Sequence, residues 1–281
     1  FISLAVCMMA GTASLPHVMM RYFTTPSVKA ARRSVGWSLF FIFLLYSSAP
    51  MLATLSKLSL MDPNLPTGII GKSIADVQAI DWYQNWNQAN LMFVSDFNGN
   101  GTLELNEFFM GGKAVVLATP EVAGLPYVIS GLVAAGGMAA AMSTADGLVL
   151  AISNALSHDI YYKMINPKAE TAKRLIVARV LLVIIGFAGA TIAALEIQGI
   201  LGSVIWAFDF AMSGLFFPLV LGVWWKRANA QGAVAGMLLG LISGTAYLVW
   251  VRNGGAGFWG VTQLTFGIVG SLVSLVSMIV V

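Results

Sequence analysis

The sequence predicts an all-α polytopic membrane protein, and three observations carry that prediction. Of the 281 residues, 58% are hydrophobic and only 10% are charged, whereas a soluble domain carries about 25% charged residues. Apolar segments long enough to span a bilayer, about 20 residues each, recur along the chain. The basic residues between these segments gather on alternate sides, as the topology of a membrane protein requires.

Seven apolar segments are expected to form the spanning helices. The third is too long for a simple span, so it must tilt strongly, break, or extend into the cytoplasm. In chain order the segments are Phe1–Phe23, Gly36–Lys57, Leu125–Tyr161, Leu175–Ile197, Ile200–Trp225, Gly232–Val251 and Thr262–Val281.

The basic residues fix the orientation of these segments. Ten of the 15 lie on one set of connections, namely Arg21, Lys29, Arg32, Arg33, Lys163, Lys168, Lys173, Arg174, Lys226 and Arg227. The opposite set holds only Lys57, Lys72, Lys113 and Arg252, and Arg179 lies just inside a helix. The richer side is cytoplasmic, which fits a multi-pass protein of the cell (inner) membrane. Residues 58–120 then form an extracytoplasmic loop.

The net charge, the cysteine content and the chain ends further narrow the class of protein. The net charge of +3 lies in short loops between apolar segments, which is a topology signal and excludes a nucleic-acid partner. The single cysteine, Cys7, permits no intrachain disulfide. Because Phe1 and Val281 both lie within apolar runs, we expect a fragment of a longer protein.

Hydroxyl and carbonyl oxygens gather on one face of the third segment. Ala140, Ser143 and Thr144 stand at i, i+3 and i+4, so they share a helix face. Two hydroxyls and a carbonyl are hard oxygen ligands without a full charge, which suits a monovalent cation that must bind and leave. The alternative is that these small residues serve helix packing.

The first segment is expected to kink or unwind at Pro16, because proline removes a backbone donor. Discontinuous helices near the midplane expose backbone groups to substrate in transporters. The candidate substrate-binding residues around this break are Gly11, Thr12, Ser14 and His17. The alternatives are an ordinary proline kink and a packing histidine.

The loop contains a twelve-residue pattern typical of a calcium-binding EF-hand loop, starting at Asp96. Gly101 at position 6 permits the sharp turn, and Leu103 at position 8 is expected to point inward. The candidate calcium ligands are Asp96, Asn98, Asn100, Thr102, Glu104 and Glu107. Two of the first three are neutral amides, so we expect weak, structural calcium binding. The alternative is an Asn/Gly-rich turn without an ion.

Two acids within apolar segments are further candidates for a functional role, and a glycine repeat is a candidate for helix packing. Asp146 and Asp209 lie within apolar segments, where an ionisable side chain is a functional hypothesis by default; their roles stay open. Gly232, Gly236 and Gly240 are spaced four apart, which predicts close helix packing.

Several separated motifs resemble the sodium:solute symporter family. The stretch 11–23, GTASLPHVMMRYF, is similar to the bacterial cation–acetate (monocarboxylate) symporter branch. The stretches 117–126 and 139–161 resemble a related bacterial branch, whose members often accompany a small membrane subunit. The stretch 224–229, WWKRAN, is also similar to the family. The resemblance covers residues 1–281, which we interpret as a partial symporter transmembrane domain.

This resemblance implies the leucine-transporter-type fold of two inverted five-helix repeats with alternating access. The chain would supply the second repeat plus two further helices. In that family the sodium site joins core helices one and eight, and the resemblance makes Ala140, Ser143 and Thr144 the helix-eight ligands. It implies a transporter in the lipid bilayer, not an enzyme.

Two hypotheses about function remain at this point. The first is a sodium-coupled symporter that imports a short monocarboxylate such as acetate, with Na⁺ as coupling ion, Ca²⁺ in the loop, and proton coupling as a variant. The second is a transporter-like sensor domain of a membrane histidine kinase. The sequence after Val281 would separate them, because a kinase module there indicates a sensor.

Overall fold

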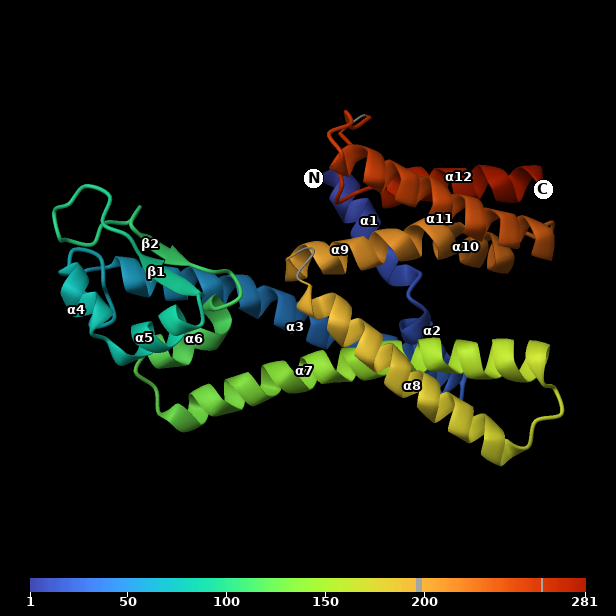
Figure 1. Cartoon of the computed structure of the whole chain (residues 1–281), viewed down its shortest axis with the longest axis horizontal. Coiled ribbons are helices and arrows are strands. Elements are labelled where there is room, and N and C mark those ends of the chain that lie inside the picture. Colours follow the sequence, from blue (N-terminus) through green and yellow to red (C-terminus); the bar gives the residue numbers. More distant parts are fainter. Residues whose placement is uncertain (196–198, 259) are drawn as a thin grey trace. The chain divides into compact units, whose positions relative to one another are not determined.

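A computed structural model describes residues 1–195, 199–258 and 260–281 (Figure 1). The chain is 72% helical with little strand, which confirms the all-α polytopic class. Among the described residues, five helices are long and apolar enough to cross a membrane, or six if one bent pair counts as a single span. Contacts divide the chain into two compact units, residues 1–25 with 146–281, and residues 26–145.

The first predicted segment is broken, as expected. It forms α1 (Ile2–Ala13) and α2 (Pro16–Phe23), which bend by 46° at the break. Pro16 stands at the first position of α2, where its missing N–H costs no hydrogen bond.

The second predicted segment is longer than expected at both ends. Helix α3 covers Val28–Met61 instead of Gly36–Lys57. The Ser27 side chain caps its start by accepting a hydrogen bond from the Ala30 N–H at 3.1 Å. At its other end, Leu60 is buried in the core of the small domain that the following loop forms, the loop domain. Hydropathy marks only the apolar part of a helix, so the polar N-terminal turns of α3, which carry Lys29, Arg32 and Arg33, escaped the prediction.

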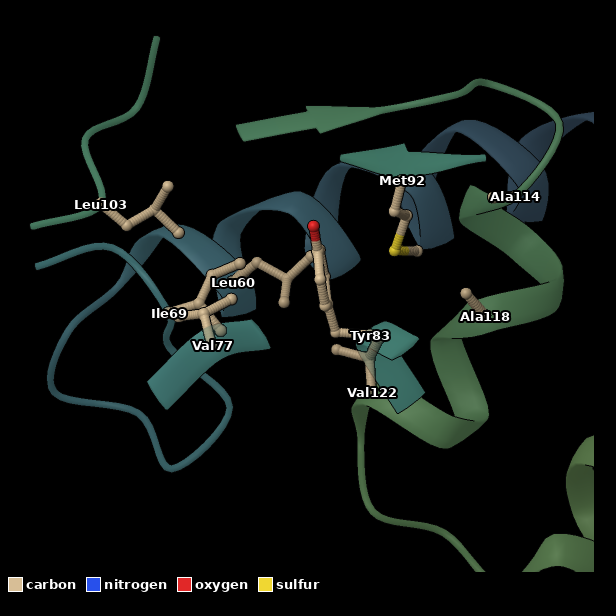
Figure 2. Packing of buried hydrophobic residues seen from close by; sticks show 9 residues of the cluster. All are labelled: Leu60, Ile69, Val77, Tyr83, Met92, Leu103, Ala114, Ala118 and Val122. Atoms are coloured by element: carbon tan, nitrogen blue, oxygen red, sulfur yellow. The ribbon is translucent and has the colours of Figure 1, made fainter. Parts of the chain in front are cut away.

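The loop domain is a small mixed structure. It contains α4 (Ile74–Gln78), α5 (Asp81–Gln88), β1 (Met92–Val94), β2 (Phe108–Met110) and α6 (Val115–Val122). The two strands are antiparallel, and Met92 lies opposite Met110. Figure 2 shows the core, to which α3, the strands and α6 all contribute; its buried residues are Leu60, Ile69, Val77, Tyr83, Met92, Leu103, Ala114, Ala118 and Val122.

The third predicted segment is one unbroken helix. It consists of α7 (Tyr127–Asn154) and a π-helical continuation, η1 (Ala155–Ile165), and together they form a 39-residue span. A break was one of the three expected alternatives, and it is absent from this described range. At about 1.5 Å per residue the helix exceeds a hydrocarbon core of about 30 Å, which leaves tilt or extension.

The remaining helices follow the predicted order. They are α8 (Thr171–Ala194), α9 (Ile200–Ala211), the π-helical η2 (Met212–Phe216), α10 (Phe217–Trp224), α11 (Ala230–Arg252) and α12 (Gly267–Val280). The predicted end of the fourth segment, Ile197, lies outside the described residues. The π turn precedes Pro218, which has no N–H to donate to the carbonyl of Gly214.

The last helix starts later than predicted. The segment was expected from Thr262, but α12 begins at Gly267. The Thr262 N–H donates to the Thr265 hydroxyl at 2.9 Å, and the Thr265 N–H donates to the Thr262 carbonyl at 3.0 Å. Hydroxyl groups that bond the local backbone compete with helix formation. The helix has 14 residues, so it is shorter than a full span.

Glycines bring α11 close to its neighbours, as their spacing predicted. In Figure 1, α11 and α12 run side by side, and they share an extensive contact. A Cβ at Gly236 would lie 2.7 Å from the Met278 side chain, and one at Gly240 would overlap the Ser213 carbonyl. Both glycines are therefore needed for the close approach of these helices.

Candidate functional site

The three residues predicted to form a cation face lie on α7. The Thr144 hydroxyl donates to the Ala140 carbonyl at 3.3 Å, so these two oxygens lie together on one side of the helix. Ser143 precedes Thr144 on the same helix, and all three residues are exposed. The face is therefore free to meet ligand oxygens from another helix.

The break between α1 and α2 holds the four candidate residues for the anion. The Thr12 hydroxyl donates to the Met8 carbonyl and the Ser14 hydroxyl donates to the Ala10 carbonyl, each at 2.6 Å. Thr12 is exposed, whereas Ser14 is buried. Both hydroxyl protons are thus engaged by the backbone in this arrangement, and the Thr12 hydroxyl would have to rotate before it could donate to an anion.

Gly11 fixes this break against a second helix. A Cβ at position 11 would lie 2.5 Å from the carbonyl oxygen of Phe208 on α9. Real Cβ atoms do not approach a backbone oxygen so closely, so only glycine lets α1 pack on α9 here. Gly11 therefore has a packing role at the place where the sequence predicted a binding role.

His17 brings α2 against the helix that carries the cation face. Its Nδ1 atom is buried and has no hydrogen-bond partner among the described residues. A Cβ at Gly147 of α7 would lie 4.0 Å from the His17 Cβ and 3.6 Å from an Arg21 nitrogen. Gly147 follows Ser143 by four residues, so it shares that helix face. The segment after the break thus contacts α7 at Gly147.

The two intramembrane acids have opposite surroundings. Asp146 is exposed on α7. Asp209, on α9, is completely buried, and neither of its carboxylate oxygens has a hydrogen-bond partner of ordinary geometry among the described residues. Sequence identified both residues but gave no basis to rank them, because burial within a helix bundle depends on the packing of distant segments.

The predicted calcium loop folds as a turn held by its own side chains. The two Asp96 carboxylate oxygens accept hydrogen bonds from the N–H groups of Gly99 (2.7 Å) and Gly101 (3.1 Å). The Asn98 side-chain oxygen accepts from the Asn100 N–H, and the Asn100 side-chain oxygen accepts from the Thr102 N–H. Gly101 has φ of +70°, the left-handed conformation that the sharp turn requires. Leu103 is buried, as its position predicted.

The two glutamates of the loop differ in role. Glu107 is fully buried, and its carboxylate oxygens accept from the N–H groups of Phe97 (2.9 Å) and Glu104 (3.0 Å). Glu104 is exposed and accepts from the side-chain amides of Asn98 and Asn100, each at 3.0 Å. Within the described ranges, no three histidine, cysteine or acidic side chains gather closely enough to hold a metal ion. A bound ion here would depend on amide and backbone oxygens as well.

Comparison with known proteins places this arrangement in a family. Residues 112–240, which include the cation face of α7, match the model of the Sodium:solute symporter family. An uncharacterised symporter of Cupriavidus necator is 44% identical over 251 residues, covering 89% of this chain and 36% of that protein.

A second relative is named for its substrate. A monocarboxylic acid transporter of Corynebacterium glutamicum is 29% identical over 245 residues, covering 86% of this chain and 37% of that protein. The chain therefore spans just over a third of the length of either relative. The chain carries a sodium:solute symporter family domain, and its apolar helices are those of a multi-pass membrane protein.

Proposed function

We propose that the protein is a sodium-coupled secondary transporter that imports a short monocarboxylate such as acetate. The observation that carries the proposal is the α7 face, where the Ala140 carbonyl and the Thr144 hydroxyl lie 3.3 Å apart within the family-matched region. Sodium prefers hard oxygen ligands, and neutral ones release the ion more readily than carboxylates do. Ser143 supplies the third oxygen of the proposed site.

The substrate class rests on the break between α1 and α2 and on the named relative. The N-terminus of α2 presents a positive dipole end, which favours a carboxylate without burying a cationic side chain. The proposed anion site comprises the break with Gly11, Thr12, Ser14 and His17.

The solute class is tested by uptake of a labelled panel into proteoliposomes that contain the full-length protein. The panel comprises acetate, propionate, pyruvate, glucose and proline. We expect sodium-dependent uptake of the monocarboxylates alone. Uptake of glucose or proline instead would reject the substrate class, and absence of any uptake would favour the sensor hypothesis.

Replacing Thr12 by valine should raise the apparent KM for acetate about tenfold, because one hydrogen bond to a charged group is worth roughly 1.5 kcal/mol. The matched variant Thr12→Ser keeps the hydroxyl and should stay near the wild-type KM. Initial rates of acetate uptake at saturating sodium measure both. A Thr12→Val protein with the wild-type KM for every monocarboxylate would remove Thr12 from the site.

We further propose that the loop of residues 96–107 binds calcium weakly, as a structural ion outside the cytoplasm. The supporting observation is the left-handed Gly101 in a turn where the side-chain oxygens of Asp96, Asn98 and Asn100 accept hydrogen bonds from N–H groups of the same loop. Glu107 would supply a bidentate carboxylate after it releases the two backbone N–H groups.

Two loop variants should change calcium affinity in opposite directions. Glu107→Gln should abolish binding, since it removes the bidentate carboxylate. Asn98→Asp should strengthen binding, because it adds a negative charge at an exposed ligand position. Calorimetric calcium titration of the purified full-length protein measures both. Equal calcium heats for wild type and Glu107→Gln would place any bound calcium elsewhere.

A further inference from the structure

Asp209 is the most deeply buried charged group of the membrane-spanning helices for which no role has been assigned. It lies midway along the 25-residue span of α9, η2 and α10, and its side chain has no solvent exposure. Neither carboxylate oxygen has a hydrogen-bond partner of ordinary geometry in the described part of the chain. A carboxylate in such a place is costly unless something compensates its charge.

The groups beside Asp209 are donors without a full charge. The Cys7 thiol of α1 and the backbone N–H groups of Phe266 and Gly267, at the start of α12, lie next to the carboxylate. A Cβ at Gly267 would lie 2.8 Å from Oδ1 of Asp209, so the carboxylate rests directly on the first residue of α12. These donors and the helix dipole stabilise a negative charge there.

No cationic side chain neutralises this carboxylate among its described neighbours. Cys7 is the one titratable residue of α1, and η2 and α12 contain none. On α11, the Tyr247 hydroxyl donates to the Val261 carbonyl, and Arg252 lies over the Trp206 ring at 5.6 Å. Burial therefore favours the neutral acid, while the surrounding donors favour the anion.

The groups around Asp209 decide whether it can bind a metal ion or a proton. The N–H and S–H groups beside the carboxylate carry partial positive charge and offer no oxygen ligand, so the site does not suit sodium. A proton needs no further ligand and converts the buried anion to a neutral acid. We propose that Asp209 is a proton-binding site of the membrane domain, separate from the α7 sodium face.

Helix α1 connects this proton site to the proposed anion site. Cys7 and Gly11 are four residues apart and share a helix face; Cys7 lies beside Asp209, and Gly11 packs on Phe208. Protonation moves a proton from a hydronium ion to one carboxylate oxygen of Asp209, which forms an O–H bond and leaves a neutral water molecule, and release of the proton reverses this step. This coupling rests on the proposed transport function, whereas the protonation itself does not.

Infrared difference spectroscopy on the full-length protein in lipid vesicles tests the proton site. The wild type should show a carboxylic-acid C=O band that grows as pH is lowered from mildly alkaline to mildly acidic. This band should be lost in Asp209→Asn and kept in Asp146→Asn, which changes the exposed acid on α7.

A second measurement separates this proposal from the proposed function. Labelled acetate uptake is recorded across the same pH range at a fixed sodium gradient, and its pH dependence should be lost in Asp209→Asn. A titrating band without acetate uptake by the wild type would reject the monocarboxylate proposal and leave the proton site standing. A wild-type spectrum without a titrating band, or one that Asp209→Asn leaves unchanged, would overturn the proton site.

Discussion

Removal of both hydroxyls from the α7 face, by Ser143→Ala combined with Thr144→Ala, should raise the sodium concentration for half-maximal uptake about a hundredfold. Each lost ligand oxygen should cost about 1.5 kcal/mol or more, by analogy with a hydrogen bond to a charged group, which is a factor of about ten. Both residues are exposed on α7, so little packing is lost. Sodium-dependent acetate uptake into proteoliposomes measures the effect.

Conservative variants provide the control for this result. Ser143→Thr and Thr144→Ser keep a hydroxyl at each position and should keep a sodium requirement close to the wild type. If the double alanine variant shows the wild-type sodium requirement, the α7 face is not the sodium site and serves helix packing instead.

Replacing Gly240 by valine should prevent correct packing of the helices around α11. A Cβ at this position would overlap the Ser213 carbonyl oxygen and lie 2.9 Å from the Ser274 Cβ. Forcing extra atoms into a packed interface costs about 1–3 kcal/mol and sometimes more, and here the obstacle includes backbone. We expect a sharp fall in the yield of monodisperse protein and a lower thermal unfolding temperature.

Gly189→Val is the matched control, because a Cβ at Gly189 on α8 meets nothing within 4 Å. It should leave yield and unfolding temperature near the wild type. Should Gly240→Val behave like Gly189→Val, the close contact among α11, η2 and α12 would be incorrect.

Hydropathy and proline act locally, so the sequence predicted most of the spans: of the seven expected, five or six are long enough to cross a membrane among the described residues. Pro16 marked the break between α1 and α2, and the Gly236–Gly240 spacing marked the α11 interface. The ends of α3 were not predictable from hydropathy, because Ser27 caps a polar turn and Leu60 packs into a separate domain. The β1–β2 hairpin was missed as well, since each strand has only three residues.

For the candidate sites as well, local sequence patterns predicted some features, and features that depend on distant segments were missed. Spacing alone put Ala140 and Thr144 on one face, because i and i+4 neighbours are fixed by helix geometry. The complete burial of Asp209 arises from contacts with α1 and α12, which are distant in sequence. The packing role of Gly11 depends likewise on Phe208 of α9, so no local pattern revealed it.

The most direct test of sodium-coupled monocarboxylate transport is accumulation of labelled acetate in proteoliposomes under an imposed inward sodium gradient, with the full-length protein. We predict accumulation above the external acetate concentration, and its collapse when an ionophore dissipates the sodium gradient. Equal acetate levels with and without the gradient, at the same membrane potential and pH, would contradict the account.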